Sequence, residues 1–235
     1  MKATPDAMQY VIPPRPLPAL PIAGGEGHFP VHRIYCIGRN YAAHAREMGK
    51  DPDREPPFFF LKPADAIVVS GTGVPYPPQT SNLHHEIELV IAIGQGGGDI
   101  AESTALDHVY GYGVGIDLTR RDLQQQAKDA GRPWDVAKGF DHSAPCTPIH
   151  PVAQIGHPRR GEIWLAVNGE SRQRSDISQM IWSVPEQIAV LSRYFKLEAG
   201  DLIFTGTPEG VGPLKRGDAL TGGVAGVDQI AIRIL

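Results

Sequence analysis

Cysteine is nearly absent from this sequence, which contains only Cys36 and Cys146. Two cysteines without paired spacing argue against a disulfide scaffold and against a cysteine-ligated zinc site, and they are typical of small buried side chains. Long apolar runs are also absent: no segment reaches the ~18 residues of a membrane-spanning helix, and the N-terminus lacks the apolar core of a signal peptide. We therefore expect no membrane association and a cytoplasmic location.

Basic residues are in slight deficit, with 22 Lys and Arg against 26 Asp and Glu, a formal net charge of −4 and an isoelectric point near 6.1. No cluster of Lys and Arg is interleaved with aromatic residues. We therefore do not expect nucleic acid as a partner, whereas a small anionic substrate stays open. The 235 residues are 41% hydrophobic, which is enough to build one sizeable core.

The first 30 residues are rich in proline and glycine, and the run 12–21 predicts an extended polyproline segment rather than a helix. We interpret residues 1–30 as an arm that lies on the domain or on a partner subunit, and residues 31–235 as a single domain. The stretch from Arg15 to Pro21 also matches a short ligand motif of modules with aromatic grooves. Recruitment by such a module is an alternative role for the arm.

Short apolar segments separated by Gly and Pro predict strands at 31–37, 58–61, 66–69, 83–93, 110–116, 163–167, 202–205 and 230–234. Helices are expected from Asn40 through Glu47, from Asp117 through Lys128, and from Ser183, where Glu186 completes a capping-box spacing. Many short strands with few helices favour a β-rich sandwich or roll over an alternating α/β fold.

The segment from Leu83 to Ile93 carries two glutamates, Glu86 and Glu88, within an apolar, β-branched run. Side chains alternate faces along a strand, so both carboxylates are expected to point to the same side. Two carboxylates aimed at one spot repel each other unless a cation lies between them or one holds a proton at a raised pKa. The pair therefore indicates a divalent metal, although glutamates with this spacing also occur on solvent-facing strands.

Asp117 follows a strand with glycine at positions 111, 113 and 115, where another group can approach the backbone closely. A carboxylate at the end of such a strand can reach into a pocket, so Asp117 is the predicted third ligand. Hard divalent cations prefer oxygen, so two or three carboxylates suit Mg²⁺ or Mn²⁺ better than zinc. We expect His84 and His85 to pack beside this site rather than to bind the ion.

His44 and Glu47 are three residues apart on an expected helix, so they share one face. The carboxylate can then orient and charge-stabilise the imidazole, and such a pair can take a proton from water. The same spacing also arises by chance on a surface helix, and spacing alone leaves that alternative open.

Six segments of the chain form a recognisable series of motifs: GRNYAAHAREM at 38–48, FLKP at 60–63, HHEIEL at 84–89, DLTRRD at 117–122, WDVAKGF at 134–140 and TGTPEGVG at 205–212. Together they resemble the fumarylacetoacetate hydrolase family, and the resemblance covers about residues 31–235. Within the family the chain is most similar to the short acylpyruvate hydrolases. The Pro-rich arm and residues 51–60 are similar to those of fumarylpyruvate hydrolases.

The resemblance implies a β-rich α+β fold, a mixed β-roll or sandwich with a few flanking helices, in which residues 31–235 are the catalytic domain of a homodimer. It implies Mg²⁺ or Mn²⁺ at Glu86, Glu88 and Asp117, which agrees with the assignment from the residues. It also implies further roles: a lid that carries His44 and Glu47, contact of Lys138 with the substrate or its enolate, and substrate positioning by Arg121, Gln124 and Thr207.

The expected reaction is metal-dependent hydrolysis of the carbon–carbon bond of a 3-acylpyruvate, with fumarylpyruvate yielding fumarate and pyruvate. The substrate is then a small anionic 2-oxo acid. Two enzymatic alternatives use related chemistry: decarboxylation of oxaloacetate, and isomerase or decarboxylase action on a related 2-oxo dienoate. A non-catalytic binding protein recruited through the Pro-rich arm is the alternative from another class.

Overall fold

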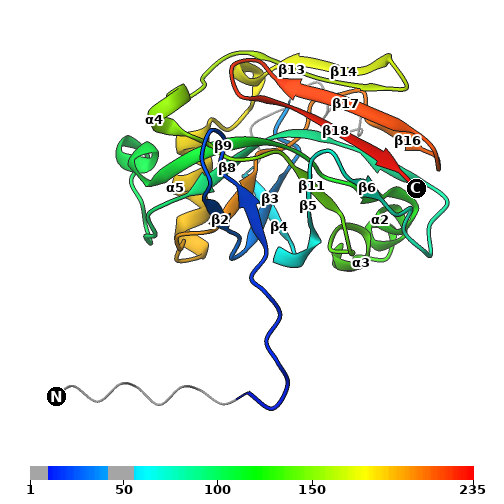
Figure 1. The fold of residues 1–235 in the computed structure, drawn as a ribbon, viewed down its shortest axis with the longest axis horizontal. Helices are drawn as coiled ribbons and strands as arrows, with labels where there is room; N and C mark the ends of the chain where they lie inside the picture. The colour runs from blue at the N-terminus through cyan, green and yellow to red at the C-terminus, as the bar shows by residue number, and fades with distance from the viewer. Residues whose placement is uncertain (1–9, 42–55) are drawn as a thin grey trace.

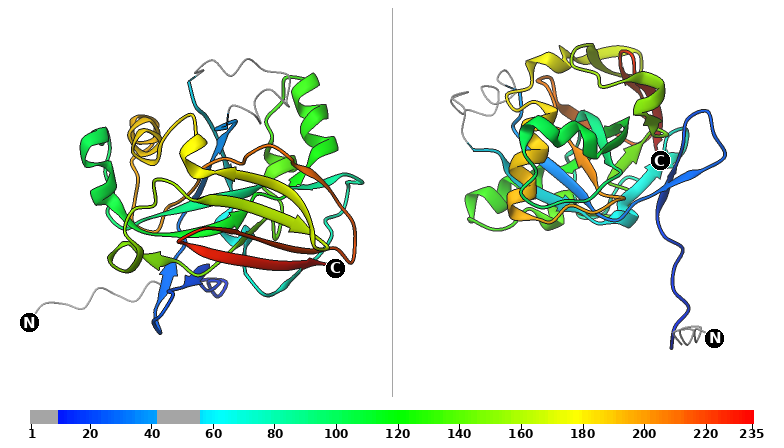
Figure 2. Two further views of the ribbon diagram at one scale, coloured as in Figure 1. Left: turned by 90° about the horizontal axis from the view of Figure 1, so that it is seen from above. Right: turned by 90° about the vertical axis from the view of Figure 1, so that its left-hand side faces the viewer.

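The computed structural model describes residues 10–41 and 56–235. The described chain is mostly sheet, with α5 (Val184–Tyr194) on one side and α2 (Arg121–Asp129) and α3 (Asp135–Lys138) on the other (Figures 1 and 2). The shorter helical pieces are η1 (Ala64–Ala66), η2 (Glu102–His108), α4 (Val152–Ile155) and η3 (Ile177–Gln179). The expected β-rich α+β fold with few flanking helices is confirmed.

The largest sheet runs in the order β4-β3-β15-β8-β9-β11-β5, and β12 also pairs with β9. The sheet is mixed, because β15 pairs with β3 and β11 with β5 in parallel while the other pairs are antiparallel. Its strands are β3 (Ile34–Gly38), β4 (Phe58–Lys62), β5 (Ile67–Val69), β8 (Ile87–Ile93), β9 (Val109–Ile116), β11 (Ala144–Cys146), β12 (His150–Pro151) and β15 (Leu202–Phe204).

A second sheet, in the order β14-β13-β17-β18-β6, lies across one face of the largest sheet (Figure 1). Its strands are β6 (Gly73–Val74), β13 (Glu162–Val167), β14 (Glu170–Asp176), β17 (Ala219–Val224) and β18 (Asp228–Ile234). Two small sheets complete the fold: β1 (Ala19–Pro21) with β2 (His28–Pro30), and the order β10-β7-β16, formed by β10 (Thr119–Arg120), β7 (Leu83–His85) and β16 (Gly212–Leu214).

Strand β8 separates two apolar cores, because its side chains alternate between them. Ile87 and Leu89 join the core cluster that includes Leu165 of β13, between the two large sheets. Val90 and Ala92 join a second cluster on the opposite face. Burial of apolar surface on both faces explains why β8 reads as a nearly continuous apolar run. By the same alternation Glu88 shares the side of Val90 and Ala92, at the end of the strand.

Strand β9 owes its three glycines to close packing against its neighbours. A Cβ at Gly111 would lie 2.3 Å from the carbonyl oxygen of His150, and one at Gly115 would lie 2.5 Å from the ring of Phe204. Real side chains cannot occupy such positions, so glycine allows β12 and the aromatic ring to approach. The close approach expected from the glycine pattern is therefore found, and β9 delivers Asp117 directly after its last residue.

Two local expectations are wrong. The run 83–93 is not one strand: it breaks at Glu86, because β7 pairs with β10 and β16 whereas β8 pairs with β9 and β15. The helix expected from Asp117 begins at Arg121, because the two preceding residues form β10. The expected capping box is confirmed in α5, where Glu186 Oε2 accepts the backbone N–H of Ser183 at 2.9 Å.

The described part of the Pro-rich arm has two sections. Val11 and Ile12 are exposed, at 101% and 75%, in a segment that extends away from the folded body (Figure 1). Leu20 of β1 and Phe29 of β2 are buried in the second apolar cluster. The division into an arm over 1–30 and one catalytic domain over 31–235 stays a prediction.

Candidate active site

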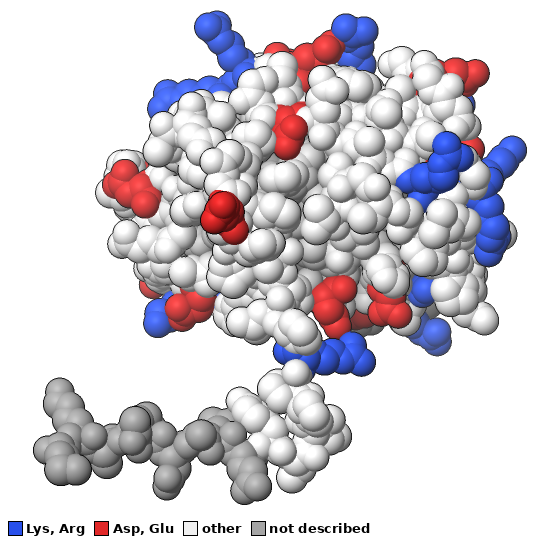
Figure 3. Space-filling model, in the orientation of Figure 1, with Lys and Arg blue, Asp and Glu red and all other residues white. Residues whose placement is uncertain are grey.

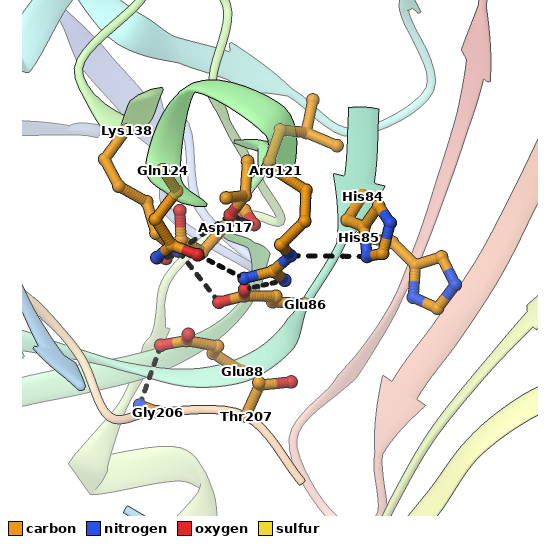
Figure 4. A network of polar contacts seen from close by, with 12 residues as sticks. His84, His85, Glu86, Glu88, Asp117, Arg121, Gln124, Lys138, Gly206 and Thr207 are labelled. Atoms are coloured by element: carbon orange, nitrogen blue, oxygen red, sulfur yellow. Dashed lines mark hydrogen bonds and ion pairs between the residues drawn. The ribbon is translucent and has the colours of Figure 1, made fainter. Parts of the chain in front are cut away.

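Three acidic side chains converge from two parts of the chain. Glu86, Glu88 and Asp117 each offer one carboxylate oxygen, and these oxygens lie within 4.8 Å of one another. All three residues are buried, with exposed fractions of 6%, 2% and 0%. Figure 4 shows them around one centre beside α2. The structure therefore brings together the three residues singled out in the sequence, although Glu86 lies at a strand break rather than within a strand.

The break at Glu86 is held by hydrogen bonds on both sides. The carbonyl oxygen of Glu86 accepts the N–H of Asp117 at 2.8 Å, which joins the break to the end of β9. The N–H of Ile87 donates to Oε1 of Gln173 at 3.1 Å, in place of a bond within the strand ladder. These bonds satisfy the backbone where the ladder stops, and they fix Glu86 beside Asp117.

Glu88 is oriented by the loop after β15. The backbone N–H of Gly206 donates to Glu88 Oε2 at 2.7 Å (Figure 4). Gly206 has φ +95°, and a Cβ there would lie 2.6 Å from the Cβ of Asn40. Only glycine accepts both this backbone conformation and this contact without a shift of the chain. The glycine-rich loop thus supplies a charge-assisted hydrogen bond to a buried carboxylate.

Two buried lysines lie against Asp117. Lys62 Nζ is 2.8 Å from Asp117 Oδ1, and Lys138 Nζ is 2.5 Å from Asp117 Oδ2. Lys138 also donates to Glu86 Oε2 at 2.9 Å and to Thr119 Oγ1 at 2.7 Å. A buried ammonium with three oxygen partners has its full set of donors satisfied. Lys138 therefore lies among the carboxylates, and α3 is the element that carries it there.

The first turns of α2 present two more of the expected residues to the site. Arg121 Nη2 is 2.5 Å from Glu86 Oε1, and Arg121 Nη1 donates to Gln124 Oε1 at 2.6 Å. Residues three apart on a helix share a face, so both side chains project toward the carboxylates (Figure 4). The structure thus places Arg121, Gln124 and Lys138 around the three acids.

Thr207 lines a pocket that Glu86, Glu88 and Lys138 also line. Its hydroxyl donates to the carbonyl oxygen of Ile87 at 2.8 Å and accepts from Gln173 Nε2 at 2.8 Å. His85 Nδ1 is 2.9 Å from Gln173 Oε1, and burial lowers the pKa of His85. Burial and the nearby Arg121 lower the pKa of His84 to about 4. Both histidines are therefore neutral near pH 7 and lie beside the carboxylates, as expected.

The pKa values of the site follow from burial and close charges. Burial, with the charges of Asp117 and Glu86, raises the pKa of Glu88 well above its ordinary value. Burial alone would lower the pKa of Lys138, but the carboxylates of Asp117 and Glu86 outweigh it, and the pKa is raised. Lys138 is thus held in its charged form. Glu88 retains a proton more readily than an ordinary glutamate unless a further cation lies beside it.

The donor set fits a hard divalent ion. The three carboxylates supply oxygen only, and no cysteine or histidine is among the ligand atoms that cluster there in the described part of the chain. Oxygen-only sites with few protein ligands are those of Mg²⁺ and Mn²⁺. The raised pKa of Glu88 is a second sign, because an added cation beside the three acids would relieve their repulsion.

His44 and Glu47 lie outside the described residues, as does most of the helix expected from Asn40. The side chain of Asn40 is described: its Nδ2 donates to the carbonyl oxygens of Trp182 at 3.0 Å and Thr205 at 2.8 Å. These bonds fasten the chain directly before the undescribed segment to the site loop. The general-base pair and the lid stay predictions.

Sequence reasoning missed Lys62, Thr119 and Gln173. Each is fully or nearly buried and touches a site residue through its side chain. Lys62 has a local signal in the sequence, because it follows an aromatic run at the end of β4. Nothing near Gln173 marks it, because it contacts residues 86 positions earlier in the chain.

On the face drawn in Figure 3, basic and acidic side chains are scattered between uncharged ones, and no continuous basic band follows this face. Among the described residues, no helix is both long and apolar enough to span a bilayer.

Residues 33–234 match the model of the fumarylacetoacetate (FAA) hydrolase C-terminal family. The crystal structure of fumarylpyruvate hydrolase from Pseudomonas aeruginosa in complex with Mn²⁺ and pyruvate is 55% identical, covers 97% of this chain and 99% of its own, and superposes with a TM-score of 0.95. A fumarylpyruvate hydrolase of Ralstonia sp is 46% identical over 80% of this chain and 98% of its own length.

A relative of similar sequence identity is named for another activity. The mitochondrial oxaloacetate tautomerase FAHD1 of Arabidopsis thaliana is 44% identical over 84% of this chain and 88% of its own length. The Mn²⁺ of the Pseudomonas aeruginosa complex agrees with the oxygen-only donor set found here, and supports Mg²⁺ or Mn²⁺ as the cofactor. The match over nearly all of the chain, together with the fold and these relatives, shows that the chain belongs to the fumarylacetoacetate hydrolase family.

Proposed function

We propose that this protein is a metal-dependent hydrolase that cleaves fumarylpyruvate, a 3-acylpyruvate, into fumarate and pyruvate. The observation that carries the proposal is the buried triad of Glu86, Glu88 and Asp117, surrounded by cationic side chains. Two relatives named fumarylpyruvate hydrolase, at 55% and 46% identity, support the choice of substrate.

The balance of charge favours a dianionic substrate. Three formal negative charges of the triad face three formal positive charges, those of Lys62, Lys138 and Arg121, at ion-pair distance. A bound Mg²⁺ or Mn²⁺ would supply Lewis-acid polarisation of a 2-oxo acid, and would leave the site two positive charges in excess. An acylpyruvate with two carboxylates would offset this excess of positive charge among the triad and its ion-pair partners.

The chain's own residues then divide the work. His44, oriented by Glu47, takes a proton from the water that attacks the distal acyl carbonyl. The bond between that carbonyl carbon and pyruvate carbon 3 breaks, and its electron pair becomes the enolate of pyruvate. Lys138, charged and buried, stabilises the developing enolate, and protonation at carbon 3 completes pyruvate. Arg121, Gln124 and Thr207 position the substrate by hydrogen bonds.

The direct test is turnover of fumarylpyruvate by the full chain with Mn²⁺ or Mg²⁺. We expect loss of the diketone absorbance and one fumarate and one pyruvate per substrate, with no turnover after chelation of the metal. Stable fumarylpyruvate in the presence of either metal would reject the proposal.

Oxaloacetate is the second candidate substrate, because the relative named oxaloacetate tautomerase is 44% identical. Its tautomerisation or decarboxylation passes through an enolate that Lys138 could stabilise equally, without an attacking water. Parallel assays decide between the candidates: oxaloacetate decarboxylation releases CO₂, tautomerisation changes the enol absorbance, and only hydrolysis of fumarylpyruvate yields fumarate. The homodimer and the cytoplasmic location belong to the same proposal.

A further inference from the structure

The pocket beside the carboxylates has an aromatic outer wall with a lysine on it. Phe58, Phe60 and Trp134 line the pocket that also contains Glu86 and Lys128. The Trp134 ring lies 5.1 Å from the Phe58 ring, edge to face, and 5.8 Å from the Phe60 ring. Aromatic rings in such arrangements stabilise one another.

Lys128 has no role in the chemistry described above. It is half-buried on α2, with Nζ 5.3 Å from the centre of the Trp134 ring. Within residues 10–41 and 56–235, no carboxylate lies at ion-pair distance from it. A cation–π contact is weak compensation for a partly desolvated ammonium. Among the described residues, Lys128 is thus a charged group at the pocket wall without a carboxylate at ion-pair distance.

We propose that Lys128 binds the carboxylate at the far end of the acyl chain, and so selects acylpyruvates with a charged tail over those with a neutral one. The proposal rests on the proposed function and assigns a specificity-determining residue to the same site.

The spacing along α2 fits this role. Arg121, Gln124 and Lys128 follow one another at intervals of three and four residues, so they line one face of the helix. At 1.5 Å per residue, Arg121 and Lys128 are separated by about 10 Å along the helix axis. The seven-carbon chain of fumarylpyruvate, at about 1.3 Å of projected length per bond, places its two carboxylates about 8 Å apart. A substrate whose 2-oxo acid end lies at the triad can therefore extend its other end along this face.

The surrounding charges point the same way. Burial and the charges of Arg121, Arg39 and Lys138 lower the pKa of Lys128 to about 8, while Glu86 opposes them. Burial and the three nearby cations all disfavour the charged form of Lys128, and only Glu86 among the named groups favours it. An incoming carboxylate reverses the balance and holds the ammonium charged.

The test compares fumarylpyruvate with acetylpyruvate, which has the same 2-oxo acid end and a neutral methyl tail. The measured quantity is the ratio of kcat/KM for the two substrates, so changes common to both cancel. Lys128→Met keeps an unbranched apolar side chain over Trp134, and should lower the ratio about tenfold or more, the effect of one charge-assisted hydrogen bond. Lys196→Met, at a side chain 74% exposed outside the pocket, is the matched control and should leave the ratio unchanged.

The pH profile gives a second readout. Lys128 is charged below its pKa of about 8 and neutral above it, so the wild-type ratio should fall as pH rises through this value. Lys128→Arg, which stays charged, should retain selectivity to higher pH. An equal ratio and profile in wild type and Lys128→Met would overturn the role of Lys128 alone. If wild type hydrolyses neither acylpyruvate, the proposed function fails, and this proposal falls with it.

Discussion

Replacement of Lys138 by methionine removes a side chain that joins two of the three carboxylates. Its ammonium lies 2.9 Å from Glu86 Oε2 and 2.5 Å from Asp117 Oδ2, at 2% exposure. Removing one partner from a buried ion pair costs about 3–5 kcal/mol. In this site the variant loses one of three cations away from water, and Glu86 keeps only Arg121 while Asp117 keeps only Lys62 among the ion pairs of the described residues. For a chain of this size each kcal/mol lowers Tm by about 2–4 °C, so metal-free Lys138→Met should melt about 6–20 °C below wild type.

Mn²⁺ should reverse much of this loss. In the variant the ion restores positive charge between the carboxylates, whereas in wild type it enters a site that is already balanced. We therefore expect Mn²⁺ to raise the Tm of Lys138→Met by more than that of wild type, at the same concentration.

Thermal unfolding with a chelator and with Mn²⁺ measures both effects, and Lys196→Met, at an exposed position, serves as the control. A variant that melts like wild type without metal, or that gains no more from Mn²⁺, would refute the charge balance argued for this site. Hydrolysis should also slow, because the developing enolate loses its nearest cation.

Four further predictions concern a ligand, its protonation, the base and the loop. Removing a group that only hydrogen-bonds to a metal ligand typically lowers metal affinity by about 10–100-fold. Glu88→Gln changes a proposed ligand itself, so it should weaken Mn²⁺ binding, measured by calorimetry, by more than this. In wild type, Mn²⁺ affinity should rise with pH, because the raised pKa of Glu88 makes a proton compete with the ion, so pH-independent binding would contradict this reading. His44→Ala should lower kcat for fumarylpyruvate by about 10²–10⁴-fold with Mn²⁺ affinity retained; wild-type turnover would exclude His44 as the base. Gly206→Ala should destabilise the protein more than Gly131→Ala. Both glycines have positive φ, but of the two only Gly206 has another atom within 3 Å of the position that a Cβ would take. Equal melting temperatures of the two variants would count against the close contact.

The sequence predicted the features that depend on neighbours in the chain. The capping box of α5 needs only Ser183 and Glu186, and the nearly continuous apolar run of β8 is visible within seven residues. The break at Glu86 was missed because it depends on pairing of β7 with β10 and β16, which are far away in sequence. An apolar run cannot reveal that its two halves pair with different strands.

The site shows the same division. The three acids were found because each follows a local pattern, the spacing of two glutamates or the end of a glycine-lined strand. Lys62 and Gln173 were missed because their partners lie far from them along the chain: Lys62 bonds to Leu118, 56 residues later, and Gln173 to His85, 88 residues earlier. Their roles depend on the tertiary fold, which brings distant buried polar groups together to satisfy one another.

Relatives of this chain are named for different reactions, so the reaction depends on which parts of the site those reactions share and which they do not. On the proposed assignment, a metal ion held by the three carboxylates would bind the 2-oxo acid and Lys138 would stabilise the enolate. Both roles would serve hydrolysis, tautomerisation and decarboxylation alike, because all three develop the same negative charge. Hydrolysis alone needs a water made nucleophilic beside the distal carbonyl. On the proposed assignment the choice between the reactions therefore depends on His44 and Glu47 rather than on the triad. Loss of His44 should slow fumarate release by about 10²–10⁴-fold while exchange of the carbon 3 protons of pyruvate continues.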